Sequence, residues 1–259
     1  MDIHVCVKQI PGPEVTPSID PETKTLVRAH PFVLDEADMH GVELALRLVE
    51  SSGGGDVVLV SMVPENETEG LRTGLAMGAA KAVLISDPAL VGSDALSTAK
   101  VLAAAMRHLQ ARLVIASTES SEGYTGTVPV QIAELLSWPA LSFVSAVELR
   151  DGELVARRQT DLGFDEIVCD LPAVMSVTAG AVEVRYPTLR GIMGARAKPV
   201  EQLSLADLDL APSEVGAGGA RQQVLSLEPI VSARRGEVLI DDGNAQDKIL
   251  ALLEQWRLI

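Results

Sequence analysis

Short runs of Val, Leu and Ile alternate with helix-like segments through the first half of the chain, and this order constrains the fold more than any other feature. Each apolar run is nearly continuous, as expected of strands buried on both faces. Strands that alternate with helices form a parallel sheet covered by helices on both sides, so we expect a doubly wound α/β fold. The predicted strands are residues 3–9, 57–62, 82–86 and 113–116; a Pro-rich loop, 10–32, precedes predicted helices at 34–50, 65–77, 93–110 and 126–137.

The pattern changes after Ala140, where four strand-like runs follow one another with short connections. These runs predict a β-rich extension of the same sheet. After Pro199 the chain becomes polar and rich in Gly and Pro, and it ends in a strand-like stretch, 224–227, and an amphipathic helix, 244–256. We therefore expect an α/β domain over residues 1–200 and a C-terminal arm, 201–259, that wraps a partner or folds back. The four runs are residues 143–149, 154–159, 166–170 and 173–177.

The charge balance excludes several classes of partner. The chain has 36 acidic and 21 basic residues and a formal net charge of -15, which repels nucleic acid and anionic lipid. It has no apolar run of the roughly 20 residues that span a bilayer and no signal-peptide pattern at its start, so we expect a cytoplasmic protein. Cys6 and Cys169 both lie in apolar strand-like runs, and we interpret both as small buried hydrophobic residues.

One loop is a candidate anion site. In open parallel sheets, ligands bind beyond the carboxyl ends of the strands, where loops and helix N-termini present free N–H groups. The loop after the predicted strand 113–116, residues 117–129, is dense in Gly, Ser and Thr, which let a phosphate approach the backbone. An ordinary polar connection is an equally good interpretation from composition alone. The chain has neither a GxGxxG nor a GxxxxGK[ST] motif.

Other polar residues give weaker signals. Asp35, Glu36 and Asp38 open the first predicted helix, where they could contact a ribose or complement the helix dipole. The four His residues are scattered without the spacing of metal ligands, and no nucleophile, base and acid set is recognisable. We therefore expect no metal site and no catalytic residues.

Residues 185–196 are basic in an otherwise acidic chain, and Leu189, Ile192 and Met193 would share one side of a short helix there. An exposed apolar tip flanked by Arg185 and other arginines indicates a docking element for a partner protein. A core helix with snorkelling arginines is the alternative.

Taken together, these stretches resemble the β subunit of electron transfer flavoproteins, including the related FixA subunit, over roughly residues 1–210. The first matches are the run from Val5 to Pro11, the Leu34-Asp35-Glu36-Ala37-Asp38 stretch and the loop from Thr118 to Pro129. Further matches lie at residues 42–47, 71–79 and 156–176; the last holds Arg158, Asp161, Gly163, Asp165 and Pro172-Ala173-Val174, the positions of the family signature.

The resemblance implies an adenine-nucleotide-hydrolase-like α/β fold that buries one AMP, while FAD sits mainly on the alpha subunit. It also implies an electron carrier, not an enzyme, whose partners are that alpha subunit and acyl-CoA or similar dehydrogenases, docked through Arg185, Leu189, Ile192 and Met193. The N–H groups from Gly123 to Thr127 would hold the phosphate. The implied pocket residues are Cys6, Asp35, Asp38, Met62, Glu119, Ser120, Ser121, Glu122, Gly123, Tyr124, Thr125, Gly126, Thr127 and Val128.

Two alternatives stay open. Bifurcating members of the family hold a second FAD in place of AMP and usually carry Asp-Gly-Asp-Thr in the loop, where this chain has Glu122-Gly123-Tyr124-Thr125. A stand-alone protein of the same fold that binds or hydrolyses nucleotides is the other alternative.

Overall fold

The computed structural model describes residues 1–63, 65–227, 238, 240, 241 and 243–259. It divides into two compact units, residues Met1–Val224 and Leu225–Ile259, which are described separately. In the described part of the chain, no helix is both long and apolar enough to cross a bilayer.

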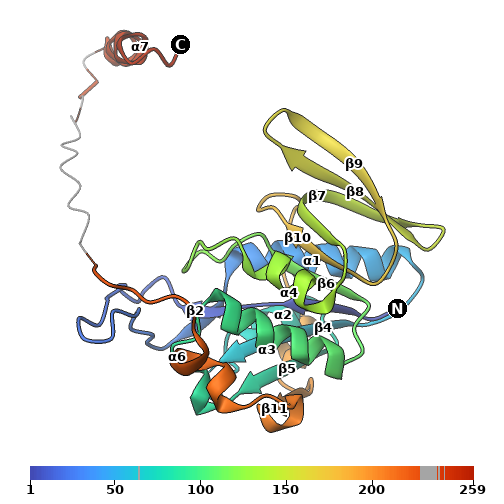
Figure 1. Ribbon diagram of the computed structural model, residues 1–259. Helices are drawn as coiled ribbons and strands as arrows, with labels where there is room; N and C mark the ends of the chain where they lie inside the picture. Colours follow the sequence, from blue (N-terminus) through green and yellow to red (C-terminus); the bar gives the residue numbers. More distant parts are fainter. Residues whose placement is uncertain (64, 228–237, 239, 242) are drawn as a thin grey trace. The chain divides into compact units, whose positions relative to one another are not determined.

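A nine-stranded sheet organises the first unit. The seven strands from β11 to β7 are parallel, and β8 and β9 extend the β7 edge as antiparallel strands (Figure 1). The predicted mostly parallel α/β fold is confirmed. In spatial order the strands are β11 (Val200–Leu203), β5 (Lys81–Ser86), β4 (Val57–Val63), β1 (Ile3–Cys6), β6 (Leu113–Ser117), β10 (Ala173–Val177), β7 (Ala140–Arg150), β8 (Glu153–Thr160) and β9 (Gly163–Cys169).

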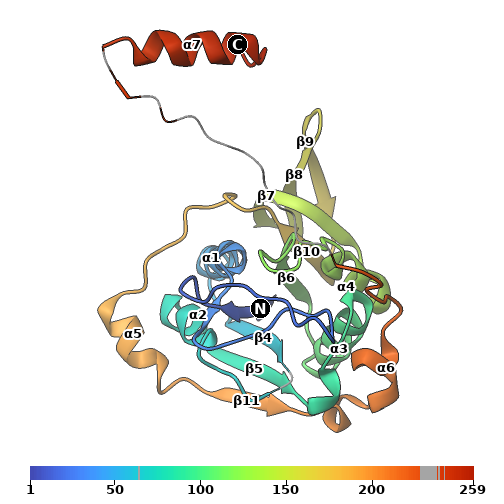
Figure 2. The same cartoon turned by 90° about the vertical axis from the view of Figure 1, so that its left-hand side faces the viewer.

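Helices cover both faces of the parallel part, which makes the fold doubly wound (Figure 2). Alternate residues of each strand point to opposite faces, so Val5 packs in the cluster under α1 and α2, whereas Cys6 packs in the cluster under α3 and α4. The helices of the first unit are α1 (Glu36–Ser51), α2 (Leu71–Met77), α3 (Ala95–His108), α4 (Val128–Leu136) and α5 (Leu189–Ala195). A shorter helix is α6 (Gly216–Gly219), and the 3₁₀ turns are η1 (Pro88–Leu90), η2 (Ala206–Leu208) and η3 (Pro212–Glu214).

The predicted β-rich extension is confirmed. The turn between β7 and β8 falls on Asp151 and Gly152, both at positive φ, which suits the tight antiparallel connection. The β8–β9 hairpin projects from the body of the unit (Figure 1). Cys169, at the end of the outermost strand, is only half-buried, so the prediction of a buried thiol is wrong for Cys169 and confirmed for Cys6.

Two predicted boundaries near the N-terminus are wrong. The first strand ends at Cys6, and Gln9–Pro11 instead forms β2, which pairs antiparallel with β3 (Phe32–Leu34) across the expected loop. The second helix begins at Leu71, not residue 65. The Gln9 amide is buried and bonds to Glu67 and Gly70, which holds the preceding residues in a turn.

The compact α/β unit extends past the expected boundary at residue 200. Strand β11 pairs with β5 at the sheet edge, and Leu203, Leu205 and Leu208 are buried against the α3 face. The strand expected at 224–227 does not form among the residues described there. In the second unit the predicted amphipathic helix is confirmed as α7 (Ala245–Gln255).

Candidate functional site

The chain reverses its direction across the sheet at β1, and polar side chains gather at the carboxyl ends of β1 and β6, a place here called the crevice. Strand β1 pairs with β4 on one side and β6 on the other, and β6 is reached only after the chain has passed through β4 and β5. Connections diverge from the carboxyl ends of such neighbouring strands, so this is where an open α/β sheet binds ligands. Lys8 follows β1, and the loop of residues 118–127, here called the β6–α4 loop, follows β6.

Asp35 fastens the base of the β6–α4 loop. Its carboxylate is fully buried; it caps α1 by accepting the Ala37 N–H and accepts both the Ser121 N–H, at 2.8 Å, and the Ser121 hydroxyl, at 2.9 Å. Asp35 therefore lies at the N-terminus of α1, where its charge also complements the helix dipole. A contact between this carboxylate and a ribose stays a prediction.

Asp38 links the two central strands. Its carboxylate accepts the Lys8 N–H at 2.6 Å and the Ser117 hydroxyl at 2.5 Å. Burial raises the pKa of Asp38 to about 7, although those two hydrogen bonds act in the opposite direction. Burial, followed by the charge of Asp38, raises the pKa of the Cys6 thiol to about 12. The Cys6 thiol is thus buried and unreactive.

Glu122 forms ion pairs with two cations, Lys8 and Arg28. Its carboxylate lies 2.6 Å from the Lys8 ammonium and forms a two-pronged pair with the Arg28 guanidinium at 2.9 and 2.8 Å. The Glu122 side chain is only 8% exposed. Burial favours a raised pKa, but hydrogen bonds from Arg28 and Lys8 outweigh it and lower the pKa of Glu122. The carboxylate is therefore ionised at neutral pH.

The second half of the loop leaves backbone N–H groups without a protein partner in the described part of the chain. The Gly123 N–H donates to the Ser120 hydroxyl and the Tyr124 N–H to the Ser120 carbonyl. Tyr124 and Gly126 both have positive φ, which turns the chain sharply before α4. Within the described residues, the N–H groups of Thr125 to Thr127 have no protein acceptor. A loop with these donors beside two cations can bind an anion.

The structure brings six of the fourteen predicted pocket residues together. Hydrogen bonds and ion pairs join these six to one another or to Lys8: Asp35, Asp38, Ser120, Ser121, Glu122 and Gly123. Thr125 to Val128 follow along the chain, Cys6 is buried at the end of β1, and Met62 lies half-buried near the end of β4. Glu119 and Tyr124 are exposed.

Sequence reasoning missed Lys8 and Arg28. Lys8 lay inside the predicted strand 3–9; because β1 ends at Cys6, Lys8 lies instead at the carboxyl edge, where open α/β sheets bind ligands. Arg28 had no usable signal, because it lies in an irregular segment without periodicity.

Comparison with known proteins places the chain in a family. Residues 23–208 match the model of the electron transfer flavoprotein domain. The chain is 36% identical over 264 residues to the electron transfer flavoprotein subunit beta of Mycobacterium tuberculosis, with 100% of this chain and 99% of the relative covered. The chain belongs to the electron transfer flavoprotein beta subunit family.

Two further relatives extend the comparison. The electron transfer flavoprotein subunit beta of Thermoanaerobacterium thermosaccharolyticum is 33% identical, covering 98% of this chain and 97% of the relative. A subunit of the caffeyl-CoA reductase-Etf complex of Acetobacterium woodii is also 33% identical, over 86% of each chain.

The predicted docking segment of this electron transfer flavoprotein subunit forms α5. Leu189 and Met193 are 75% and 72% exposed and Ile192 lies between them in sequence, so the apolar residues face outward, not into a core. Arg185 is engaged elsewhere: its guanidinium pairs with Glu43 at 2.7 Å and Glu50 at 2.6 Å on α1. Docking through these four residues stays a prediction.

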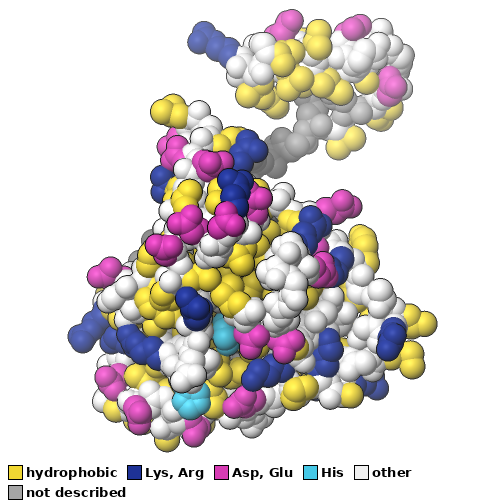
Figure 3. Space-filling view, turned by 90° about the vertical axis from the view of Figure 1, so that its right-hand side faces the viewer, with side chains coloured by type: hydrophobic (Ala, Val, Ile, Leu, Met, Phe, Trp, Pro, Cys, Tyr) yellow, Lys and Arg dark blue, Asp and Glu magenta, His cyan; other side chains and the backbone are white. Residues whose placement is uncertain are grey.

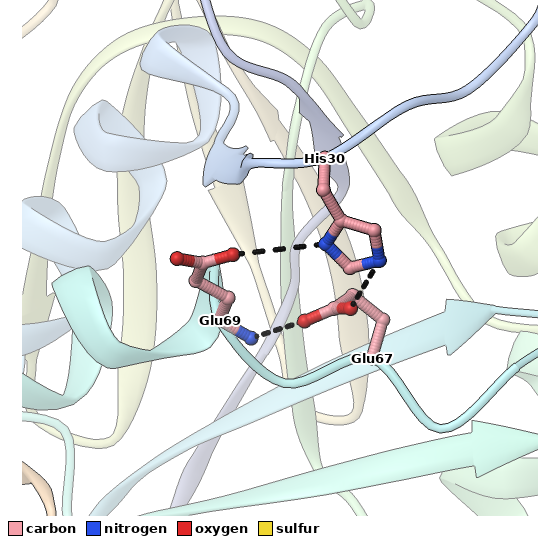
Figure 4. Close-up of side chains that lie close together, drawn as sticks. All are labelled: His30, Glu67 and Glu69. Carbon is pink, nitrogen blue, oxygen red and sulfur yellow. Dashed lines mark hydrogen bonds and ion pairs between the residues drawn. The ribbon is translucent and has the colours of Figure 1, made fainter.

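A second group of titratable residues lies near the N-terminal segment. The His30 ring faces Glu67 through Nε2 at 3.3 Å and Glu69 through Nδ1 at 3.8 Å (Figure 4). The two carboxylates therefore meet different nitrogens of one ring, an arrangement suited to ion pairing. Glu67 also accepts the N–H groups of Thr68 and Glu69, so its carboxylate stabilises the turn before α2.

An open hollow of about 340 Å³ lies between α1, β7 and residues 181–182, lined partly by Leu44, Leu48 and Val182. Hydrophobic side chains gather on the body of the unit below the projecting hairpin (Figure 3). The hairpin itself exposes Leu162 and Phe164, and the Arg157 guanidinium stacks 3.7 Å from the Phe164 ring.

Proposed function

We propose that this chain is the beta subunit of a heterodimeric electron carrier: it binds AMP as a structural ligand in the crevice at β1 and β6, supports an FAD-carrying alpha subunit and docks acyl-CoA or similar dehydrogenases. The observation that carries the proposal is the group of anion-binding residues at the carboxyl ends of β1 and β6. Lys8 and Arg28 supply positive charge there, and the β6–α4 loop supplies N–H groups that have no acceptor among the described residues. No residue of this chain needs to act as an acid, a base or a nucleophile.

The residues present fit a mononucleotide. A phosphate monoester carries about −1.5 to −2 charge near pH 7, and it suits two cations, the hydroxyls of Ser120, Thr125 and Thr127 and unpaired backbone donors. The site is preformed, because the buried carboxylates of Asp35 and Asp38 hold the loop and Lys8 through hydrogen bonds. Such preorganisation lowers the entropy cost of binding.

The pocket assignment is tested by identifying its ligand. The chain is co-purified with its flavoprotein partner, and the nucleotides released by acid are identified and counted by mass spectrometry. The proposal predicts AMP and one FAD per heterodimer. Two FAD and no AMP would mean the bifurcating type. Absence of any nucleotide would contradict the pocket assignment. Nucleotide turnover by the isolated chain would favour the stand-alone protein.

Electron transfer through the alpha subunit's FAD, which accepts electrons from a client dehydrogenase, requires a docking surface on the complex. Leu189, Ile192 and Met193 are suited to this role, since buried apolar anchors carry a large share of interface energy. Leu189→Glu should lower electron acceptance from a client dehydrogenase at least about 10-fold, through loss of a hot-spot contact.

A matched control is Val91→Glu, the same change at an exposed residue next to η1. It should leave electron acceptance unchanged. If the rate falls equally in both variants, or in neither, α5 is not the docking site. The FAD content of the two complexes is measured alongside, so that a lost partner subunit is not mistaken for lost docking.

A further inference from the structure

Glu122 already occupies the place that an incoming anion would take. Its carboxylate is the acceptor that Lys8 and Arg28 share, and the loop backbone lies close, since a Cβ on Gly123 would be 3.7 Å from the Lys8 ammonium. The other carboxylates of the crevice are engaged elsewhere: Asp35 binds Ser121, and Asp38 binds Ser117 and the Lys8 N–H. Among the residues that the structure describes, Glu122 is the carboxylate that pairs with both side-chain cations.

The charges do not balance if Glu122 stays in place. Lys8 and Arg28 supply two positive charges, and Glu122 cancels one of them. A phosphate monoester with about −1.5 to −2 charge would then face one net positive charge beside a buried like charge. Carboxylate and phosphate oxygens also compete for the same guanidinium N–H groups, because both bind arginine in a two-pronged manner.

We propose that Glu122 is an internal stand-in for phosphate, which a nucleotide's phosphate monoester displaces from Lys8 and Arg28 on binding. The inference rests on the proposed function and adds a means of controlling the same site. Arg28 belongs to the segment between β2 and β3, and its pair with Glu122 is a contact of that segment with the β6–α4 loop. When phosphate replaces Glu122, Arg28 therefore contacts the phosphate in place of the β6–α4 loop.

The proposal distinguishes Glu122 from an acid that lies outside the predicted pocket. Glu22 is an exposed acid on the segment that carries Arg28, and no cation pairs with it in the part of the chain that the structure describes. Removing either charge changes the net charge of the protein equally. Only removal of Glu122 releases Lys8 and Arg28, so the pair Glu122→Gln and Glu22→Gln separates specific displacement from general repulsion.

The experiment is calorimetric titration of the nucleotide-stripped, full-length chain with AMP and, separately, with adenosine. Glu122→Gln should bind AMP about 10-fold more tightly than the wild type, because a charge-assisted competitor is lost. Glu22→Gln should differ from the wild type less than about 2-fold, as expected of an exposed charge. Adenosine lacks the phosphate, so its affinity should be equal in all three proteins.

A second variant removes a cation instead of the anion. Arg28→Gln should weaken AMP binding about 10-fold through loss of a two-pronged phosphate partner and leave adenosine unaffected. Unchanged or weaker AMP binding by Glu122→Gln, with adenosine unaffected, would overturn the displacement. Failure of the wild type to bind either ligand would instead overturn the proposed nucleotide site, so the two failures are distinguishable.

Discussion

The β6–α4 loop and helix α5 both present groups outward, but they are fastened in different ways. The loop depends on charged side chains: Asp35 holds Ser121, and Glu122 holds Lys8 and Arg28. Helix α5 depends on close backbone packing against α2. A Cβ on Gly191 would lie 2.4 Å from the Ala76 carbonyl oxygen, closer than atoms can pack.

Hydrogen bonds between the C-terminal end of α5 and α2 are of one kind. Arg72 donates to the Ala195 carbonyl, and Lys198 donates to the carbonyls of Leu75 and Ala79 at the end of α2. These bonds go to backbone acceptors that do not titrate. The stability of the loop should therefore depend on pH and on bound anions. The stability of α5 should depend instead on the volume of the side chains that pack between it and α2.

The largest expected effect is loss of the loop's buried anchor. Asp35→Ala leaves the N–H groups of Ala37 and Ser121 without their acceptor and should lower the free energy of unfolding by about 3 kcal/mol, since each such bond to a charged group contributes about 1.5–3 kcal/mol. Ser121→Ala removes only the hydroxyl bond and should cost about 1 kcal/mol. Chemical denaturation of both variants measures the two values; equal losses would show that Asp35 does not anchor the loop.

A smaller effect is expected from a single methyl group on α5. Gly191→Ala forces the helix away from α2 and should cost about 2 kcal/mol, as overpacking does. Gly194 is the matched control, because a Cβ there meets no atom within 4 Å. Gly194→Ala should stabilise by up to about 1 kcal/mol through helix propensity. Thermal unfolding of the two variants tests the packing, and a stable Gly191→Ala protein would contradict it.

The sequence predicted the two regions to different degrees for physical reasons. Strand and helix periodicity located the crevice, because the carboxyl ends of parallel strands must meet at one edge. The apolar residues of α5 were readable from their spacing. Arg28 was not, because its position follows from a tertiary pair with Glu122. The late start of α2 was missed for the same reason, since Gln9 acts from a distant segment.

The third expectation is that the stability of the folded protein depends on pH through Asp38. The folded protein holds the Asp38 proton more tightly than the unfolded chain, because burial raises the pKa of Asp38 from 3.8 to about 7. Protonation therefore favours the folded state. The contribution of Asp38 to stability is present below about pH 4, falls as the pH rises from about 4 to about 7, and is constant above that, with a slope of at most about 1.4 kcal/mol per pH unit.

Asp38→Asn should remove that slope while keeping both hydrogen bonds, since an amide can accept from the Lys8 N–H and donate to the Ser117 oxygen. Glu122 and Glu43 have lowered pKa values and contribute in the opposite sense, but only below about pH 4.5, so the two windows separate. Denaturation of wild type and variant at several pH values gives the difference. A difference independent of pH between 4 and 7 would mean that Asp38 is ionised throughout, and the loop would then lose its distinction from α5 as the pH-sensitive region.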